Sequence, residues 1–194
     1  MSEEEIIRGC ARHESASQRA LYEIYFPKMM QVCIRYAKNQ QDTKEILLDG
    51  FKNIFNNFSH FADASAKKKN DASPDSPEEW IKKQIVESAI RHMHANKREY
   101  FVSSTVSARD SEKISSSEIT DEQIIKSADK KIILKALQQL SPSYRAIYNL
   151  HEVDGYSHQE ISKLLDISEY TSKDSLSKAK FNLRKNLVRI VPAN

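Results

Sequence analysis

Basic side chains gather in two stretches of this 194-residue chain, although the formal net charge is only +3. The stretch 80–98 contains a single acid, Glu87, and the stretch 175–194 contains none. Clustered Lys and Arg bind phosphates through point charges and bidentate hydrogen bonds, so the pattern predicts a polyanionic partner. The basic residues are Lys82, Lys83, Arg91, Lys97 and Arg98 in the first stretch and Lys178, Lys180, Arg184, Lys185 and Arg189 in the second.

The residues before and within the second basic stretch have the spacing of a helix-turn-helix. A short helix over 157–165, a turn at Asp166 and Ile167 and a longer helix from Glu169 are expected, and the second helix of such a unit enters the DNA major groove. Its outward side chains can contact phosphates and base edges. These are Tyr170, Thr171, Lys173, Asp174, Ser177 and Lys178. The same spacing also fits an ordinary helical hairpin with a solvated charged face.

Other kinds of chemistry find little material in the sequence. The three glycines leave little material for a phosphate-binding loop or for a glycine-rich dinucleotide fingerprint. Cys10 and Cys33 have no second pair of cysteines with which to form a zinc site. The six histidines have no metal-ligand spacing, and neither Cys has an evident base partner. Apolar runs are far too short to cross a membrane. We therefore expect a soluble, cytoplasmic protein with no cofactor, no metal, no catalytic residue and no small-molecule substrate.

The elements that position the first basic stretch are helical. Apolar residues from Leu21 to Tyr36 recur at three- and four-residue steps, with Pro27 expected to kink or split that helix. A second helix is expected over 42–58 and a loop over 63–76. Ser76, Pro77 and Glu79 form a helix start with a capping box, opening a helix that ends near residue 97. We expect Trp80 to be a core anchor beneath this cap, and Tyr100 and Phe101 after the helix suit stacking on a splayed base.

The second half shows the same helical pattern after a Ser-rich stretch. Short helices are expected before Ser141 and from there to about Gly155, and a capping box of Ser157 and Glu160 opens the helix-turn-helix. No strand pattern competes anywhere. The fold class is therefore all-α, with two small helical domains over 1–100 and 129–194 joined by a flexible linker over 101–128.

Two sets of motifs carry a family resemblance. Residues 137–145, 155–161, 167–169 and 172–180 resemble the C-terminal domain, domain four, of extracytoplasmic-function (ECF) RNA polymerase sigma factors of the sigma-70 family, closest to the group abundant in Bacteroidetes. Residues 20–37 and 48–51 independently resemble sigma domain two. The resemblance implies an alternative sigma factor, a bacterial transcription initiation factor without catalytic chemistry. Its implied partners are core RNA polymerase, promoter DNA and an anti-sigma factor, soluble or membrane-anchored.

The resemblance also assigns roles to residues. Domain two would bind the clamp coiled coil of core RNA polymerase and recognise the minus-ten element, and domain four would read the minus-thirty-five element. The implied polymerase-binding residues are Asp42, Glu45, Asp49 and Phe51. The implied minus-ten residues are Lys83, Arg91, His94, Lys97 and Arg98. The implied minus-thirty-five residues are His158, Gln159, Thr171, Lys173, Asp174, Ser177 and Lys178.

Several positions depart from the family pattern. Asp166 stands in the helix-turn-helix turn where relatives usually have Gly, and Asp tolerates the left-handed conformation that such a turn requires. The other departures alter polymerase-binding or DNA-reading positions. They are Lys44, Leu48, Glu87, Arg91, Tyr170 and Asp174.

Two other function classes are compatible with parts of this pattern. A helix-turn-helix transcriptional regulator that does not engage core polymerase would use the C-terminal helices, with the N-terminal half as a partner-binding module. For Phe51, Ile54 and Phe55, packing in the domain core is the alternative to polymerase contact. An enzyme is the third class, and the sequence gives it the least support.

Overall fold

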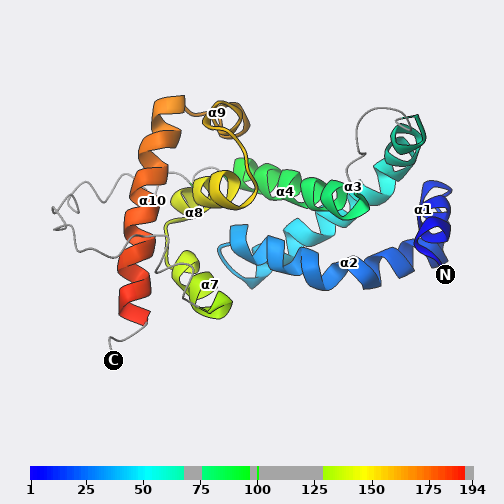
Figure 1. The fold of residues 1–194 in the computed structure, drawn as a ribbon, viewed down its shortest axis with the longest axis horizontal. Helices are drawn as coiled ribbons and strands as arrows, with labels where there is room; N and C mark the ends of the chain where they lie inside the picture. Colours follow the sequence, from blue (N-terminus) through cyan, green and yellow to red (C-terminus); the bar gives the residue numbers. More distant parts are fainter. Residues whose placement is uncertain (68–75, 97–99, 101–128, 191–194) are drawn as a thin grey trace. The chain divides into compact units, whose positions relative to one another are not determined.

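The computed structural model describes residues 1–67, 76–96, 100 and 129–190, and within these ranges every regular element is helical. The all-α prediction is confirmed. The chain divides into two compact units, Met1–His92 and Met93–Asn194, which we call the first and second unit. Figure 1 shows the helices of each. The expected linker over 101–128 lies outside the described residues, and the expected domain bounds remain predictions.

The first unit is built from α1 (Glu3–Ala11), α2 (Ser15–Tyr36), α3 (Gln40–Lys67) and the part of α4 (Pro77–Ala95) that ends at His92. Helix α1 contacts both α2 and α3, and α2 packs against α3 (Figure 1). The sequence prediction missed α1, although its capping box of Ser2 and Glu5 was a usable signal, with each side chain bonded to the other's backbone N–H.

Helix α2 runs unbroken through Pro27, so of the kink or split that the sequence predicted, the split is absent. Proline removes one hydrogen bond, but here its ring is exposed while Tyr25 and Met29, on either side of it, are buried. Packing of the neighbouring turns against the core holds the helix together across the missing bond.

Helix α3 is longer than predicted and occupies part of the expected loop. It continues past Phe58 because the apolar period continues to Phe61, which is buried and stacks on Trp80 with ring centroids 4.7 Å apart. Trp80 also meets the fully buried Phe58 edge-on at 5.5 Å. The prediction of Trp80 as a core anchor is confirmed, as is the capping box: Ser76 Oγ accepts from the Glu79 N–H, and Glu79 accepts from the Ser76 N–H.

Helices α3 and α4 approach each other closely at Gly50. A Cβ on Gly50 would lie 2.4 Å from Cδ1 of Ile85, a buried residue of α4. The glycine therefore leaves room for the end of the Ile85 side chain between the two helices.

The second unit contains α7 (Lys130–Gln138), α8 (Pro142–Tyr148), the π-helical turn η2 (Asn149–Val153), α9 (His158–Leu165) and α10 (Glu169–Ile190). Helix α10 contacts α7, α8 and α9 (Figure 1). Side chains of Asp129 and Ser141 cap α7 and α8, and Gly155 takes φ +78° in the connection to α9. The core is mostly aliphatic, although Tyr100 and Tyr148 are also buried in it. Its largest buried members on α10 and α9 are Leu176, Leu183, Leu187, Ile161 and Leu165.

Candidate nucleic-acid interface

Helices α9 and α10 form the predicted helix-turn-helix, and local side chains fix both of its ends. Ser157 and Glu160 make the expected capping box at the start of α9. Asp166 ends α9 in the left-handed conformation, with φ 53° and ψ 53°, as expected for a residue in the place of glycine. Ser168 Oγ then accepts from the Thr171 N–H at 2.9 Å and so caps α10.

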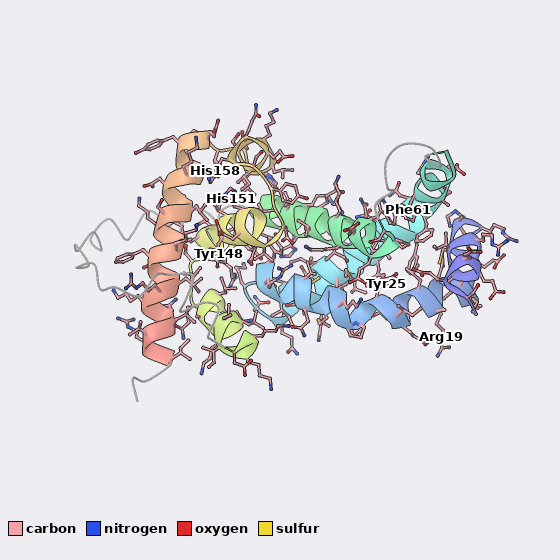
Figure 2. The ribbon with its side chains drawn as sticks, in the orientation of Figure 1. Arg19, Tyr25, Phe61, Tyr148, His151 and His158 are labelled. Carbon is pink, nitrogen blue, oxygen red and sulfur yellow. The ribbon has the colours of Figure 1, made fainter. Side chains whose placement is uncertain are left out.

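His158 joins α9 to α10 rather than pointing freely outward. Its Nδ1 is 2.9 Å from Oγ of the buried Ser172 on α10, and its ring stacks on His151 with centroids 4.3 Å apart (Figure 2). Burial, together with the nearby His151 and Lys173, lowers the pKa of His158. The lowered pKa favours the neutral ring, which suits a side chain stacked on a second histidine.

The outward face of α10 carries the residues that the sequence predicted for it. Thr171, Lys173, Ser177 and Lys178 are exposed, Asp174 is half-buried, and Tyr170 is 79% exposed. Gln159 on α9 is exposed as well. The opposite side of α10 is buried through Ser172, Ser175, Leu176, Ala179, Leu183 and Leu187. The helix therefore presents a polar, basic face with one large aromatic ring.

The lysines of this face are paired within their own helix. Lys173 Nζ lies 2.9 Å from Glu169, and Lys178 Nζ lies 2.7 Å from Asp174, each one helical turn away. The hydrogen bond that Lys178 donates to Asp174 raises the pKa of Lys178, which stays charged. Exposed pairs of this kind contribute only about 0.3–0.5 kcal/mol, so a phosphate can compete for either lysine.

The four residues that the resemblance assigned to polymerase binding differ in accessibility. Glu45 and Asp49 are exposed on α3, whereas Asp42 is 7% and Phe51 is 3% exposed. Phe51 packs against Tyr22 of α2 with ring centroids 4.6 Å apart. Asp42 accepts from the Lys38 N–H and donates its own N–H to Asn39 at the start of α3. Both buried side chains thus have roles within the unit.

The acidic residues of α3 face α4, which the sequence prediction did not foresee. Arg91 Nη2 is 3.0 Å from Asp49 Oδ2, and His92 lies 3.6 Å from Asp42 and 3.7 Å from Glu45. The signal was available: the three acids are spaced three and four residues apart and so share one side of the helix. Which helix they face could come only from the fold.

The predicted minus-ten residues are only partly described. Lys83, Arg91 and His94 are exposed on α4, whereas Lys97 and Arg98 lie outside the described residues. Tyr100 is buried, so its ring is not available for stacking on a base in this structure, and Phe101 is not described.

Some of the other described residues carry groups that could bind a metal ion or react. Among all the described residues, no group of three or more His, Cys, Asp or Glu side chains is arranged to hold a metal ion. Cys10 and Cys33 are buried, and burial raises the pKa of their thiols to about 11 and about 12, respectively. None of the described helices combines the length and the apolar character needed to cross a membrane.

Comparison with known proteins finds a family match within the second unit. Residues 130–181 match the family "Sigma-70, region 4", and the match spans all of α7, α8, η2 and α9 and the first half of α10. No curated protein matches the chain. The matched family is a domain of transcription factors and not of enzymes, and it supports a sigma-type, DNA-binding role in transcription initiation that involves core RNA polymerase and promoter DNA.

Proposed function

We propose that the protein is an alternative sigma factor of the extracytoplasmic-function type, which directs bacterial core RNA polymerase to specific promoters from the cytoplasm. The observation that carries the proposal is the match of residues 130–181 to sigma-70 region 4, in a unit whose helix-turn-helix exposes a basic face. Its activity would be restrained by an anti-sigma factor.

In this proposal α10 reads the minus-thirty-five element as duplex DNA. Lys173 and Lys178 exchange their acidic neighbours for phosphates or guanine edges, and Thr171 and Ser177 bond phosphate or base. Asp174 accepts from a cytosine amine, and Gln159 contacts DNA from the start of α9. His158 orients α9 on α10 through Ser172.

The first unit, together with the residues that follow it from Met93 to Arg98, supplies the other two contacts in this proposal. On α4, Lys83, Arg91 and His94 hold the backbone of the melted minus-ten strand, continued by Lys97 and Arg98. On α3, the exposed Glu45 and Asp49 meet a basic polymerase surface, and the adjacent Leu48, which is 67% exposed, adds an apolar contact. Asp42 and Phe51 support that surface from within the unit.

The test is run-off transcription with bacterial core polymerase and a library of genomic promoters. We expect transcripts that require the protein, and we expect Lys173→Gln and Lys178→Gln each to reduce them and to lower the salt dependence of duplex binding by about one unit of slope. Lys135→Gln, an exposed lysine of α7 outside the proposed interface, is the matched control. Absence of promoter-dependent transcription together with absence of polymerase binding contradicts the proposal.

A transcriptional regulator that ignores core polymerase is the second candidate. The burial of Asp42 and Phe51 favours it, because two of the four implied polymerase residues offer little surface to a partner. A pull-down with core polymerase separates the candidates: the regulator binds duplex DNA tightly by itself and leaves the polymerase in solution, whereas the sigma factor is retained.

A further inference from the structure

Asp49 and Arg91 belong to two different proposed surfaces, yet they bind each other. Asp49 lies on α3, which we assign to polymerase, and Arg91 lies on α4, which we assign to DNA. Arg91 Nη2 donates to Asp49 Oδ2 at 3.0 Å and to Ser88 Oγ at 2.6 Å. Asn53 donates to the same Asp49 oxygen at 3.2 Å. Both charged side chains are about half exposed, so each is within reach of a partner.

We propose that Asp49 masks Arg91 in the free protein, and that a basic partner surface bound to Asp49 releases Arg91 to the phosphates of single-stranded DNA. The inference rests on the proposed function and adds a coupling between its two surfaces. One carboxylate oxygen cannot give its full interaction to Arg91 and to a basic partner at the same time. Binding of the partner and binding of DNA are therefore cooperative, and the coupling is reciprocal.

The size of the effect follows from the exposure of the pair. Exposed ion pairs contribute little to a folded protein, and the corresponding change in affinity is about two- to fivefold. A masking contact of this strength is weak enough to be broken by a polymerase surface and strong enough to measure. Ser88 is buried and lies on α4 itself, so it can keep the released guanidinium near its position.

The experiment is a double-mutant cycle on DNA binding by the full chain without polymerase. The probe is a labelled single-stranded oligonucleotide of mixed sequence at low salt, and the variants are Asp49→Asn, Arg91→Gln and their combination. We expect Arg91→Gln to weaken binding less than about twofold in the wild-type background, because Arg91 is already paired. In the Asp49→Asn background we expect the loss of DNA affinity caused by Arg91→Gln to be about two to five times larger than in the wild-type background.

The outcomes separate the inference from the proposed function. Equal losses from Arg91→Gln in both backgrounds overturn the masking and leave Arg91 as a DNA contact. No loss in either background overturns the masking and also the DNA role of Arg91. Trp80 fluorescence, which reports on the packing of α4 against α3, shows whether each variant has kept its fold.

Because the coupling is reciprocal, a second experiment measures how the same variants change the affinity for core RNA polymerase. We expect Asp49→Asn to weaken polymerase binding, and Arg91→Gln to strengthen it about two- to fivefold because Asp49 is released. Glu23→Gln is the control, since Glu23 forms a more exposed pair with Arg19 at 2.9 Å on α2, outside both proposed surfaces, and its loss should alter neither affinity. Unchanged polymerase affinity in both Asp49→Asn and Arg91→Gln overturns the coupling.

Discussion

The basic residues proposed to bind DNA are neutralised in different ways in the two units. In the first unit, Arg91 is paired across helices with Asp49, which precedes it by 42 residues. In the second unit, Lys173 and Lys178 are each paired with an acid one turn earlier on the same helix. A pair within one helix affects only the surface of that helix. A pair across two helices connects two surfaces. Asp49 and Arg91 connect the two surfaces proposed for the first unit, whereas the pair between elements in the second unit, Lys180 of α10 with Glu152 of η2 at 2.9 Å, involves no residue of the proposed minus-thirty-five interface.

The cores of the two units also differ, in the kind of side chain that fills them. Aromatic rings from α3 and α4 meet in the first unit, where Phe58, Phe61 and Trp80 are in mutual contact. The core of the second unit is largely Leu, Ile and Ala along α10 and its neighbours. Because the chain has one Trp and it lies in the first unit, the two cores can be observed separately.

The largest expected effect separates the two cores. Phe58→Ala removes a fully buried ring that contacts both Phe61 and Trp80, and we expect it to destabilise the first unit by about 3–5 kcal/mol. In thermal unfolding, the Trp80 fluorescence transition should move to lower temperature. The circular-dichroism signal of the helices in the second unit should persist at temperatures above the Trp80 transition.

Leu183→Ala is the matching variant in the second unit. Leu183 is fully buried on α10, and its truncation should cost that unit about 2–5 kcal/mol while the Trp80 transition stays in place. A common shift of the fluorescence and circular-dichroism transitions in both variants would contradict separate folding of the units.

The capping boxes allow a comparison at smaller amplitude. Ser76→Ala in the first unit and Ser157→Ala in the second remove the same kind of cap, and each should cost about 1 kcal/mol in the free energy of unfolding of its own unit. Denaturant titration followed by Trp80 fluorescence and by circular dichroism measures the two losses separately. Ser76→Thr and Ser157→Thr retain a capping hydroxyl and should restore most of the stability.

Local signals in the sequence were enough to predict most of the helix boundaries. Side chains at Ser76, Ser141 and Ser157 form the caps that their spacing predicted, and Asp166 takes the left-handed conformation. These features depend on neighbouring residues only, so a sequence carries them in full. Two errors occurred where distant packing decides: Phe61 extends α3 by stacking on Trp80, and α2 continues through Pro27. The missed helix α1 is different, because its capping box of Ser2 and Glu5 was a local signal.

The candidate sites likewise differ in how far the sequence could predict them. The outward face of α10 follows from the period of one helix, and its predicted residues are found there. The ion pair of Asp49 with Arg91 and the hydrogen bond of His158 with Ser172 join residues of different helices. Their charges and spacing are visible in the sequence, but which groups meet depends on how the helices pack, and no local pattern encodes that.

A pH titration should distinguish the units through His158. Its pKa is lowered in the folded protein from the usual 6.5, so the fold favours the neutral ring. The associated stability is complete above pH 6.5 and is lost as the pH falls below it towards the folded-state pKa, because the unfolded chain then binds the proton more tightly. We expect the second unit to lose stability over this range by less than the capping variants do.

The control for this titration is a histidine without such an environment. His158→Gln should remove the pH-dependent loss, whereas His60→Gln, at an exposed position of α3, should leave it unchanged. Denaturant midpoints of the circular-dichroism transition between pH 7.5 and 5.5 provide the measurement. An identical pH dependence in wild type and His158→Gln would show that the stacked histidines do not set it.

The smallest expected effect tests the central difference between local and cross-helix pairs. Asp174→Asn frees Lys178 and removes a charge that repels phosphate. Duplex DNA of random sequence, in which Asp174 has no fixed cytosine partner, should therefore bind about two to three times more tightly, a change within the range of exposed ion pairs. This gain should be the same with the free protein and with its complex with core polymerase, because the pair lies within α10. Asp49→Asn should raise single-stranded DNA affinity by a similar factor in the free protein only, since polymerase already holds Asp49 in the complex. Fluorescence anisotropy at fixed salt measures both affinities. The coupling is contradicted if Asp49→Asn still raises the affinity for single-stranded DNA in the polymerase complex. In that case the pair of Asp49 and Arg91 affects DNA binding alone, as the pair of Lys178 and Asp174 does.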